Sequence, residues 1–267
     1  MPDDTREDKL RLGGMALANG LLVHGPTHWA AAVRRPDGTI GVASGPKPRL
    51  QGRIERVPGA RGIVRLGEAM VVIPLVKRAL PEARLPFQEG KVLAAAAVAS
   101  VGGAALRKRA RGGLGGEAAV AALSLVPSLV ALRGGDVAAY HGVEHKAIAA
   151  YEAGDDDARD AAKEHDRCGS HLMVPLLAAN LAGITVLRRV LERPSKLADA
   201  AVSAASVGAA VEVFAWSERH AGSPAARALR RPGHELQRAV GTREPTEEQL
   251  DVGRAALGEI LRAEGRS

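Results

Sequence analysis

Two short clusters of histidine, glutamate and cysteine could bind a metal ion. In the first cluster, His141, Glu144 and His145 occupy positions i, i+3 and i+4, so a helix would project all three side chains from one face. The second cluster begins at His165 and adds Cys168, the single cysteine of the chain, three residues later. Imidazole and thiolate groups are the usual zinc ligands in proteins. The spacing therefore predicts a zinc site shared by the two clusters.

The number of protein ligands decides what such a site can do. Four ligands would close the coordination shell, as in structural sites, whereas three would leave a position for a water molecule that could be activated. The third ligand could then come from either residue of the second cluster. Glu144 is the candidate general base, because it shares the helix face of the histidines without being a required ligand. The predicted ligands are His141, His145, His165 and Cys168.

The residues of these clusters also have a simpler interpretation. They could be polar groups that hydrogen-bond the ends of apolar helices without binding a metal. Lys146, which follows the first cluster, is expected to be an exposed charge on a helix. His171, which begins an apolar run, could be a reserve ligand or an interfacial residue, and the second is the expectation. The acidic stretch 155–157 marks the loop that would bring the second cluster back to the first.

The composition narrows the class of protein. Aromatic residues make up only 2% of the 267 residues, so the base-stacking platforms of nucleic-acid-binding proteins are scarce. The net charge of +7 instead favours contact between basic segments and anionic lipids. Small side chains such as alanine and glycine suit closely packed helices, including helices in membranes. A mean hydropathy of −0.05 argues against a wholly embedded protein.

Four apolar segments predict the helices of the central region. A helix that crosses a hydrocarbon core of ~30 Å needs ~20 residues, and the first three uninterrupted runs are shorter. The residues alone therefore leave membrane spanning and a buried soluble bundle both open. If the segments span, the basic residues between the members of each pair would lie on one side, predicted to be cytoplasmic, and the metal-binding residues on the other. Partly re-entrant segments, or a site close to the membrane plane, are the alternatives to this arrangement. The segments are Val92 to Leu106, Ala118 to Leu132, Leu172 to Leu187 and Leu197 to Trp216.

Smaller elements are predicted on both sides of these helices. Two apolar runs flank the turn signal of residues 35–38 and indicate a β-hairpin. Thr246 and Gln249 form a capping-box pattern for a last helix that ends near Ala263. The predicted fold class is mainly α: a membrane-associated bundle of about four apolar helices with a small N-terminal β-containing region and a polar C-terminal helix.

Three regions follow from this division of the sequence. Residues 1–90 are predicted to hold the glycine-rich β region and an amphipathic helix. Residues 91–217 are predicted to hold the apolar helices, with the His/Glu/Cys site at 140–171. Residues 218–267 are predicted to form the polar tail and its helix.

Several motifs together resemble the YqhQ-like bacterial proteins, a family of unknown function. The resemblance runs in the same order from about Leu12 to Leu257, and it implies a membrane-associated, metal-dependent enzyme whose four apolar segments are membrane helices. Relatives carry Glu in place of Asn19 and Arg in place of His24, so the resemblance assigns no catalytic role to the N-terminal loop. The motifs are Gly13-Gly14…Asn19-Gly20…Gly25-Pro26, Tyr140-His141-Gly142-Val143-Glu144-His145-Lys146, His165-Asp166-Arg167-Cys168-Gly169-Ser170 and Pro232-Gly233…Leu236-Gln237…Thr242-Arg243-Glu244-Pro245.

The leading hypothesis is a zinc-dependent hydrolase at the membrane, with Glu144 as the catalytic base. The alternative is a non-catalytic membrane scaffold with a structural metal site. The expected location is the cell membrane, as a multi-pass protein, with the side of the site left open. The expected partners are membrane lipids and a small-molecule or peptide substrate. A homo-oligomer is compatible with the sequence, and nucleic acid is not expected.

Overall fold

The N-terminal region forms a four-stranded antiparallel sheet in the order β1-β2-β3-β4. Leu17 pairs with Gly20, so β1 and β2 join in a tight turn. Arg34 pairs with Ile40 across a second turn, in which Gly38 has a φ of +85° that glycine adopts without steric cost. This turn confirms the predicted hairpin. The strands are β1 (Gly13–Leu17), β2 (Gly20–His24), β3 (His28–Arg34) and β4 (Ile40–Pro46).

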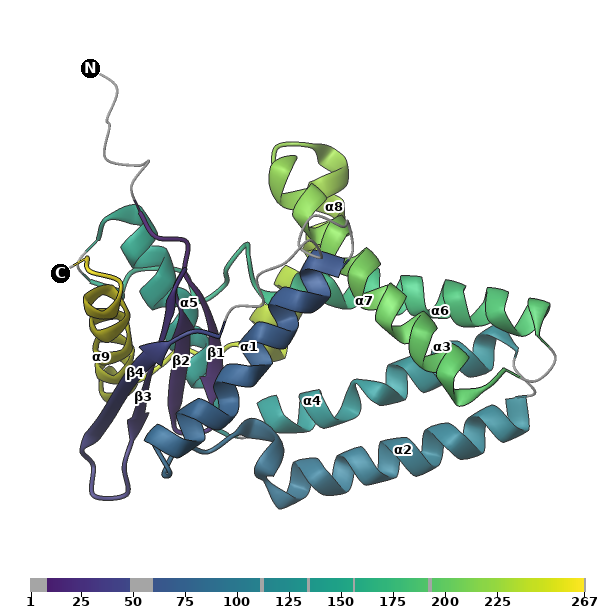
Figure 1. Ribbon diagram of the computed structural model, residues 1–267, viewed down its shortest axis with the longest axis horizontal. Coiled ribbons are helices and arrows are strands. Elements are labelled where there is room, and N and C mark those ends of the chain that lie inside the picture. The colour runs from purple at the N-terminus through teal and green to yellow at the C-terminus, as the bar shows by residue number, and fades with distance from the viewer. Residues whose placement is uncertain are drawn as a thin grey trace.

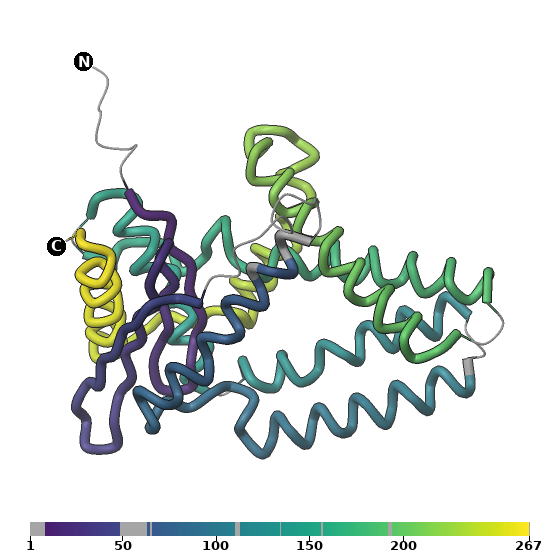
Figure 2. Tube along the Cα trace, viewed as in Figure 1, coloured from purple at the N-terminus to yellow at the C-terminus, as the bar shows by residue number. Residues whose placement is uncertain are grey.

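Both faces of the sheet are covered by helices, because successive residues of a strand point to opposite faces. On one face, Leu22, Trp29 and Val33 pack with Val72 and Val76 of helix α1 (Ala60–Ala79). The opposite face packs against helices α5 (Val137–Ala153) and α9 (Glu247–Ala263). Figure 2 shows the first and last described parts of the chain side by side at this end of the molecule. The core around the sheet therefore joins segments from both ends of the sequence.

Four long apolar helices extend away from the sheet (Figure 1). They are long and apolar enough to cross a membrane, as segments Gly90–Arg109, Leu114–Leu132, Gly169–Val190 and Lys196–Arg219. Between 11% and 17% of the residues in these segments are buried inside the protein, so most of their apolar surface faces outward. The helices themselves are α2 (Gly90–Ala110), α3 (Leu114–Ser124) with α4 (Val126–Leu132), α6 (Met173–Val190) and α7 (Lys196–Arg219).

The four apolar helices form two hairpins, and the helix ends that each hairpin connects lie at the same end of the molecule, far from the sheet (Figure 1). Glu117 of α3 connects the hairpins at this end. Its side chain is 6% exposed and pairs with Arg107 of α2 at 3.4 Å and with Arg188 of α6. The pairing fixes the two hairpins to each other next to their basic turns.

The last segments connect α7 back to the sheet. Helix α8 (Pro224–Leu236) leads into a short π-helical segment, η4 (Gln237–Gly241). Thr246 and Gln249 form the predicted capping box at the start of α9, which ends at Ala263 as expected. The computed structural model describes residues 9–48, 60–110, 113–133, 135–155, 157–191 and 194–266.

Candidate functional site

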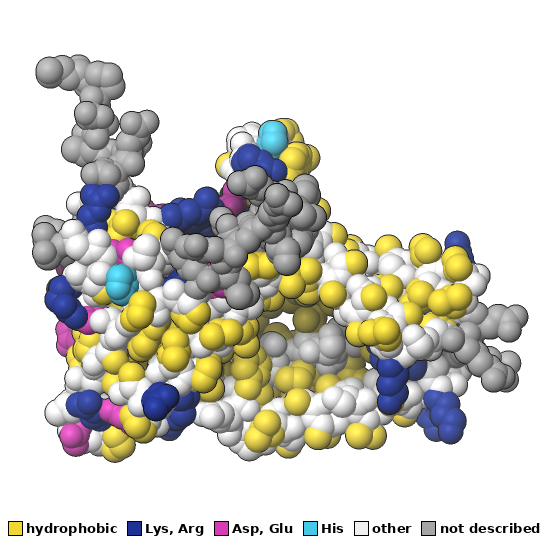
Figure 3. Space-filling view, in the orientation of Figure 1, with side chains coloured by type: hydrophobic (Ala, Val, Ile, Leu, Met, Phe, Trp, Pro, Cys, Tyr) yellow, Lys and Arg dark blue, Asp and Glu magenta, His cyan; other side chains and the backbone are white. Residues whose placement is uncertain are grey.

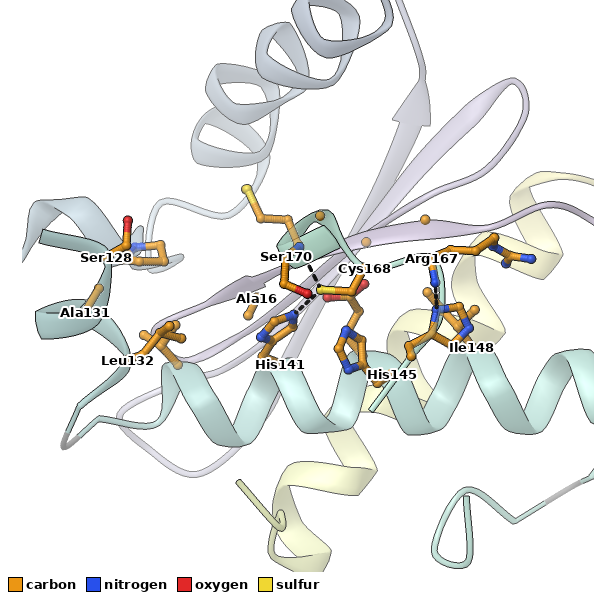
Figure 4. A pocket seen from close by; sticks show the side chains of 18 of the residues that line it. Ala16, Ser128, Ala131, Leu132, His141, His145, Ile148, Arg167, Cys168 and Ser170 are labelled. Atoms are coloured by element: carbon orange, nitrogen blue, oxygen red, sulfur yellow. Dashed lines mark hydrogen bonds between the residues drawn. The ribbon is translucent and has the colours of Figure 1, made fainter. Parts of the chain in front are cut away.

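Helix α5 carries the first cluster and presents it to a cavity. The helix packs against β1 and β2 on one side and against α9 on another. His141, Glu144 and His145 all line a cavity of about 460 Å³, as their spacing on one helix face predicts. Figure 4 shows His141 and His145 projecting from α5 toward Cys168.

Backbone carbonyl groups fix the tautomer of both histidines. Nδ1 of His141 lies 2.8 Å from the carbonyl oxygen of Gly241, and Nδ1 of His145 lies 2.6 Å from that of Lys163. A carbonyl oxygen only accepts hydrogen bonds, so each Nδ1 carries the proton and each Nε2 keeps a lone pair. Metal-binding histidines are oriented in this way. Nε2 of His145 is buried without a hydrogen-bond partner among the described residues.

Cys168 completes a group of three candidate ligands. The loop before α6 places Sγ of Cys168 3.3 Å from Nε2 of His141. Ligand atoms of His141, His145 and Cys168 all lie within 4.8 Å of one another. In a tetrahedral zinc site, bonds of ~2.0–2.3 Å place ligand atoms on the order of 3.5 Å apart. The three side chains could therefore hold one ion after small adjustments.

His165 lies beside this group, but its ring nitrogens are engaged elsewhere. Its ring centroid is 5.7 Å from that of His145. Nδ1 accepts a hydrogen bond from the backbone N–H of Arg167 at 3.3 Å, and Nε2 lies 3.5 Å from a carboxylate oxygen of Glu152. Burial raises the pKa of Glu152, but hydrogen bonds from His165 and Arg167 outweigh that effect and lower it. The structure thus brings three of the four predicted ligands together.

Glu144 borders the same cavity and is 8% exposed. Its side chain lies against Gly14 of β1, where an added Cβ would be 2.6 Å from Cγ and 2.7 Å from Cδ of Glu144. Glycine at this position therefore makes room for the carboxylate. The site combines two imidazoles, a thiol and a carboxylate around one cavity, and the first three could hold a metal ion.

Comparison with known proteins places this site inside a recognised domain. Residues 133–263 match the family model described as "Protein of unknown function (DUF1385)". The matched segment is just under half of the chain. The match agrees with the resemblance to the YqhQ-like family, and all four predicted ligands and Glu144 lie within it. No curated protein and no solved structure matches the chain.

Gln237, which lies in the segment that matches the DUF1385 model, holds the loop that carries Cys168. This residue is fully buried. Its Oε1 accepts from the backbone N–H of His165 at 2.8 Å, and its Nε2 donates to the carbonyl of His165 at 3.2 Å and to Oγ of Ser170 at 2.7 Å. These hydrogen bonds hold the loop on both sides of Cys168. Gln237 stands in one of the motifs that resemble the YqhQ-like proteins, but its local sequence gives no sign of this role.

Lys146 of α5 is buried, so the expectation of an exposed charge is wrong. Its side chain is 5% exposed, and its Nζ pairs with Glu244 at 2.6 Å. Nζ also donates to the carbonyl oxygens of Arg159 and Ala161 at 2.8 Å each. The segment after α5 folds over the helix and covers Lys146. The same segment presents the Lys163 carbonyl to His145, so Lys146 helps to position a candidate ligand.

Proposed function

We propose that this protein is a zinc-dependent hydrolase that acts at the membrane. The observation that carries the proposal is the group of His141, His145 and Cys168, whose ligand atoms lie within 4.8 Å of one another. Both imidazoles already point an unprotonated nitrogen away from the carbonyl groups that hold them. Two imidazoles and a thiolate are a donor set that suits zinc.

The count of ligands favours catalysis over a closed structural site. His165 directs its ring nitrogens toward Arg167 and Glu152, so three protein ligands remain. Three protein ligands are typical of catalytic zinc sites, which keep a position for water or substrate. A bound zinc ion would supply a Lewis acid at the edge of the cavity.

The residues of the chain supply the proton transfers of hydrolysis. Glu144 borders the cavity on the same helix face as both histidines. Its carboxylate would accept a proton from the attacking water molecule and then deliver it to the leaving group. The water oxygen forms the new bond to the substrate, and the bond to the leaving group breaks. Gly14 provides the space that keeps Glu144 beside the cavity.

A non-catalytic scaffold is the second candidate, and one observation favours it. His141 and His145 lie on α5, which packs on the sheet, whereas Cys168 stands just before the second apolar hairpin. An ion bound by all three would therefore join the sheet to the membrane helices. In that case the metal would stabilise the fold, and Glu144 would be dispensable.

The proposed location is the membrane, as a multi-pass protein. The four apolar helices leave most of their surface outside the protein core, and exposed apolar surface of that extent is unfavourable in water. Val98 and Val101 of α2 illustrate it, because their side chains are 68% and 71% exposed. We expect the protein to remain in the pellet after a carbonate wash of membranes, and recovery in the soluble fraction would contradict this location.

The test of the hydrolase compares two neighbouring residues of α5. We expect Glu144→Gln to keep the zinc content and melting temperature but to fail in complementing a strain that lacks the gene, because a general base is typically worth ~10²–10⁴-fold in rate. His145→Ala should lose zinc, and His165→Ala should retain it. Full complementation by Glu144→Gln, together with inactive His145→Ala, would support the scaffold instead.

A further inference from the structure

The cavity that contains the three candidate ligands has two unlike ends. Figure 4 places Ser128, Ala131 and Leu132 of the α4 region at one end and Arg167 at the other. Phe87, just before α2, also lines the cavity. The ligands lie between these ends. One end of the cavity is therefore built by α4, the site-proximal part of a helical segment that is apolar enough to cross a membrane.

We propose that the cavity takes a membrane amphiphile, with its hydrocarbon chain toward α2 and α4 and its hydrolysable polar group at the candidate ligands. This inference rests on the proposed function and names its substrate class. The polar group would be an ester, amide or phosphoester. Hydrolysis adds the water oxygen to the carbonyl carbon or phosphorus atom, and the leaving group departs with the proton that Glu144 carries.

The arrangement of the two hairpins supports entry from the side. The hairpins are joined near their basic turns by the Glu117–Arg188 ion pair and by contacts between α3 and α6. Figure 3 shows a hollow between the hairpins, bordered by hydrophobic side chains. In a membrane, lipid chains would occupy such a space. On this proposal, a hydrocarbon chain approaches the α4 end of the cavity from within the bilayer.

The size and lining of the cavity fit part of an amphiphile rather than a whole lipid. A volume of about 460 Å³ is within the range of small-molecule sites, which is roughly 300–1,000 Å³. It would hold the polar group and the first part of a chain, while the rest of the chain lies in the bilayer. Phe87 is 60% exposed, which places a large apolar side chain at the cavity edge, where a chain would leave it.

Photocrosslinking of a lipid probe tests this inference on the full-length protein. The protein is placed in nanodiscs of phosphatidylethanolamine and phosphatidylglycerol that contain phosphatidylglycerol with a diazirine near the carbonyl end of one acyl chain. After irradiation, peptides are mapped by mass spectrometry. We expect crosslinks in the peptides that contain Phe87 and Leu132. A second probe with the diazirine at the far end of the chain should label Val98 and leave the cavity residues unlabelled.

A blocking variant and a matched control locate the labelling. Ser128 lines the cavity at an exposed position, so Ser128→Trp should obstruct it and reduce cavity labelling at least fivefold. Val101→Trp adds the same side chain to an exposed position of α2 outside the cavity lining, and should leave cavity labelling unchanged. Zinc content and melting temperature are measured for each. If Ser128→Trp fails to fold, the comparison of the two probes on the wild-type protein is the test of the inference.

The outcomes separate this inference from the proposed function. If the protein binds zinc but the first probe does not label the cavity, the proposal of an amphiphilic substrate is wrong. The proposed hydrolase would then act on a soluble substrate. Equal labelling of the cavity by both probes also overturns the amphiphilic substrate, as does unchanged labelling of a folded Ser128→Trp variant. A wild-type protein that binds no zinc overturns the hydrolase, whatever the labelling shows.

Discussion

Gln237 binds both backbone groups of His165, a residue 72 positions earlier in the chain. Its Oε1 lies 2.8 Å from the N–H nitrogen of His165, and its Nε2 lies 3.2 Å from the carbonyl oxygen. Side chains that position metal ligands are typically worth ~10–100-fold in metal affinity. We therefore expect Gln237→Ala to weaken zinc binding by about 10–100-fold, as measured by competition with a chelating dye.

The neighbouring Arg238 provides the control for this prediction. Its guanidinium pairs with Glu235 on the surface and is 64% exposed, so Arg238→Ala should leave zinc affinity unchanged. Equal affinities of Gln237→Ala and the wild-type protein would show that the loop holds Cys168 in place without Gln237.

Gly14 and Gly13 allow a sharper test of the position of Glu144. A Cβ at Gly14 would stand 2.6–2.8 Å from three atoms of the Glu144 side chain, whereas a Cβ at Gly13 would meet nothing within 4 Å. Gly14→Ala should displace the carboxylate and reduce complementation, while zinc content stays the same. Gly13→Ala, which adds the same methyl group to the same strand, should behave as the wild-type protein. A fully active Gly14→Ala variant would argue against a catalytic role for Glu144.

The elements that local sequence determines were predicted well. The four apolar segments, the hairpin around Gly38 and the capping box at Thr246 each depend on residues close together in the chain. The i, i+3, i+4 spacing likewise places His141, Glu144 and His145 along one cavity. Such features are fixed by periodicity and turn chemistry.

Features that depend on distant contacts could not be predicted in the same way. The carbonyl of Gly241 fixes the His141 ring across 100 residues of sequence. The choice between Cys168 and His165 depends on Glu152 and the Arg167 amide, which engage the His165 ring. Lys146 is buried because a separate loop covers it. In each case the deciding partner lies outside the local pattern.

His24 makes the stability of the sheet depend on pH. Burial, with a smaller effect of the Lys47 charge, lowers the pKa of His24 from 6.5 to about 4. As the pH falls below 6.5, the unfolded chain binds a proton at this residue, whereas the folded protein does so only near pH 4. The free energy of unfolding should therefore decrease between about pH 6.5 and pH 4, on the order of 2–3 kcal/mol from this residue.

Thermal unfolding in detergent at several pH values measures this effect. His24→Gln removes the titrating group, so its melting temperature should fall less than that of the wild-type protein between pH 7 and pH 4.5. Parallel pH profiles of the two proteins would mean that His24 titrates alike in the folded and unfolded states.

The orientation of the helices gives the last prediction. The last turns of α2 and α6 carry basic residues and lie at the end opposite the site, and basic residues beside membrane helices favour the cytoplasmic side. Arg109 lies near the first turn, whereas Ala221 lies after α7 at the site end; both are exposed. In a Cys168→Ser background, an impermeant maleimide added to intact cells should label Ala221→Cys and leave Arg109→Cys unlabelled until the cells are opened. The background protein without an added cysteine should stay unlabelled throughout. Labelling of both positions from one side would contradict two spanning hairpins, and the reverse pattern would place the site on the cytoplasmic side.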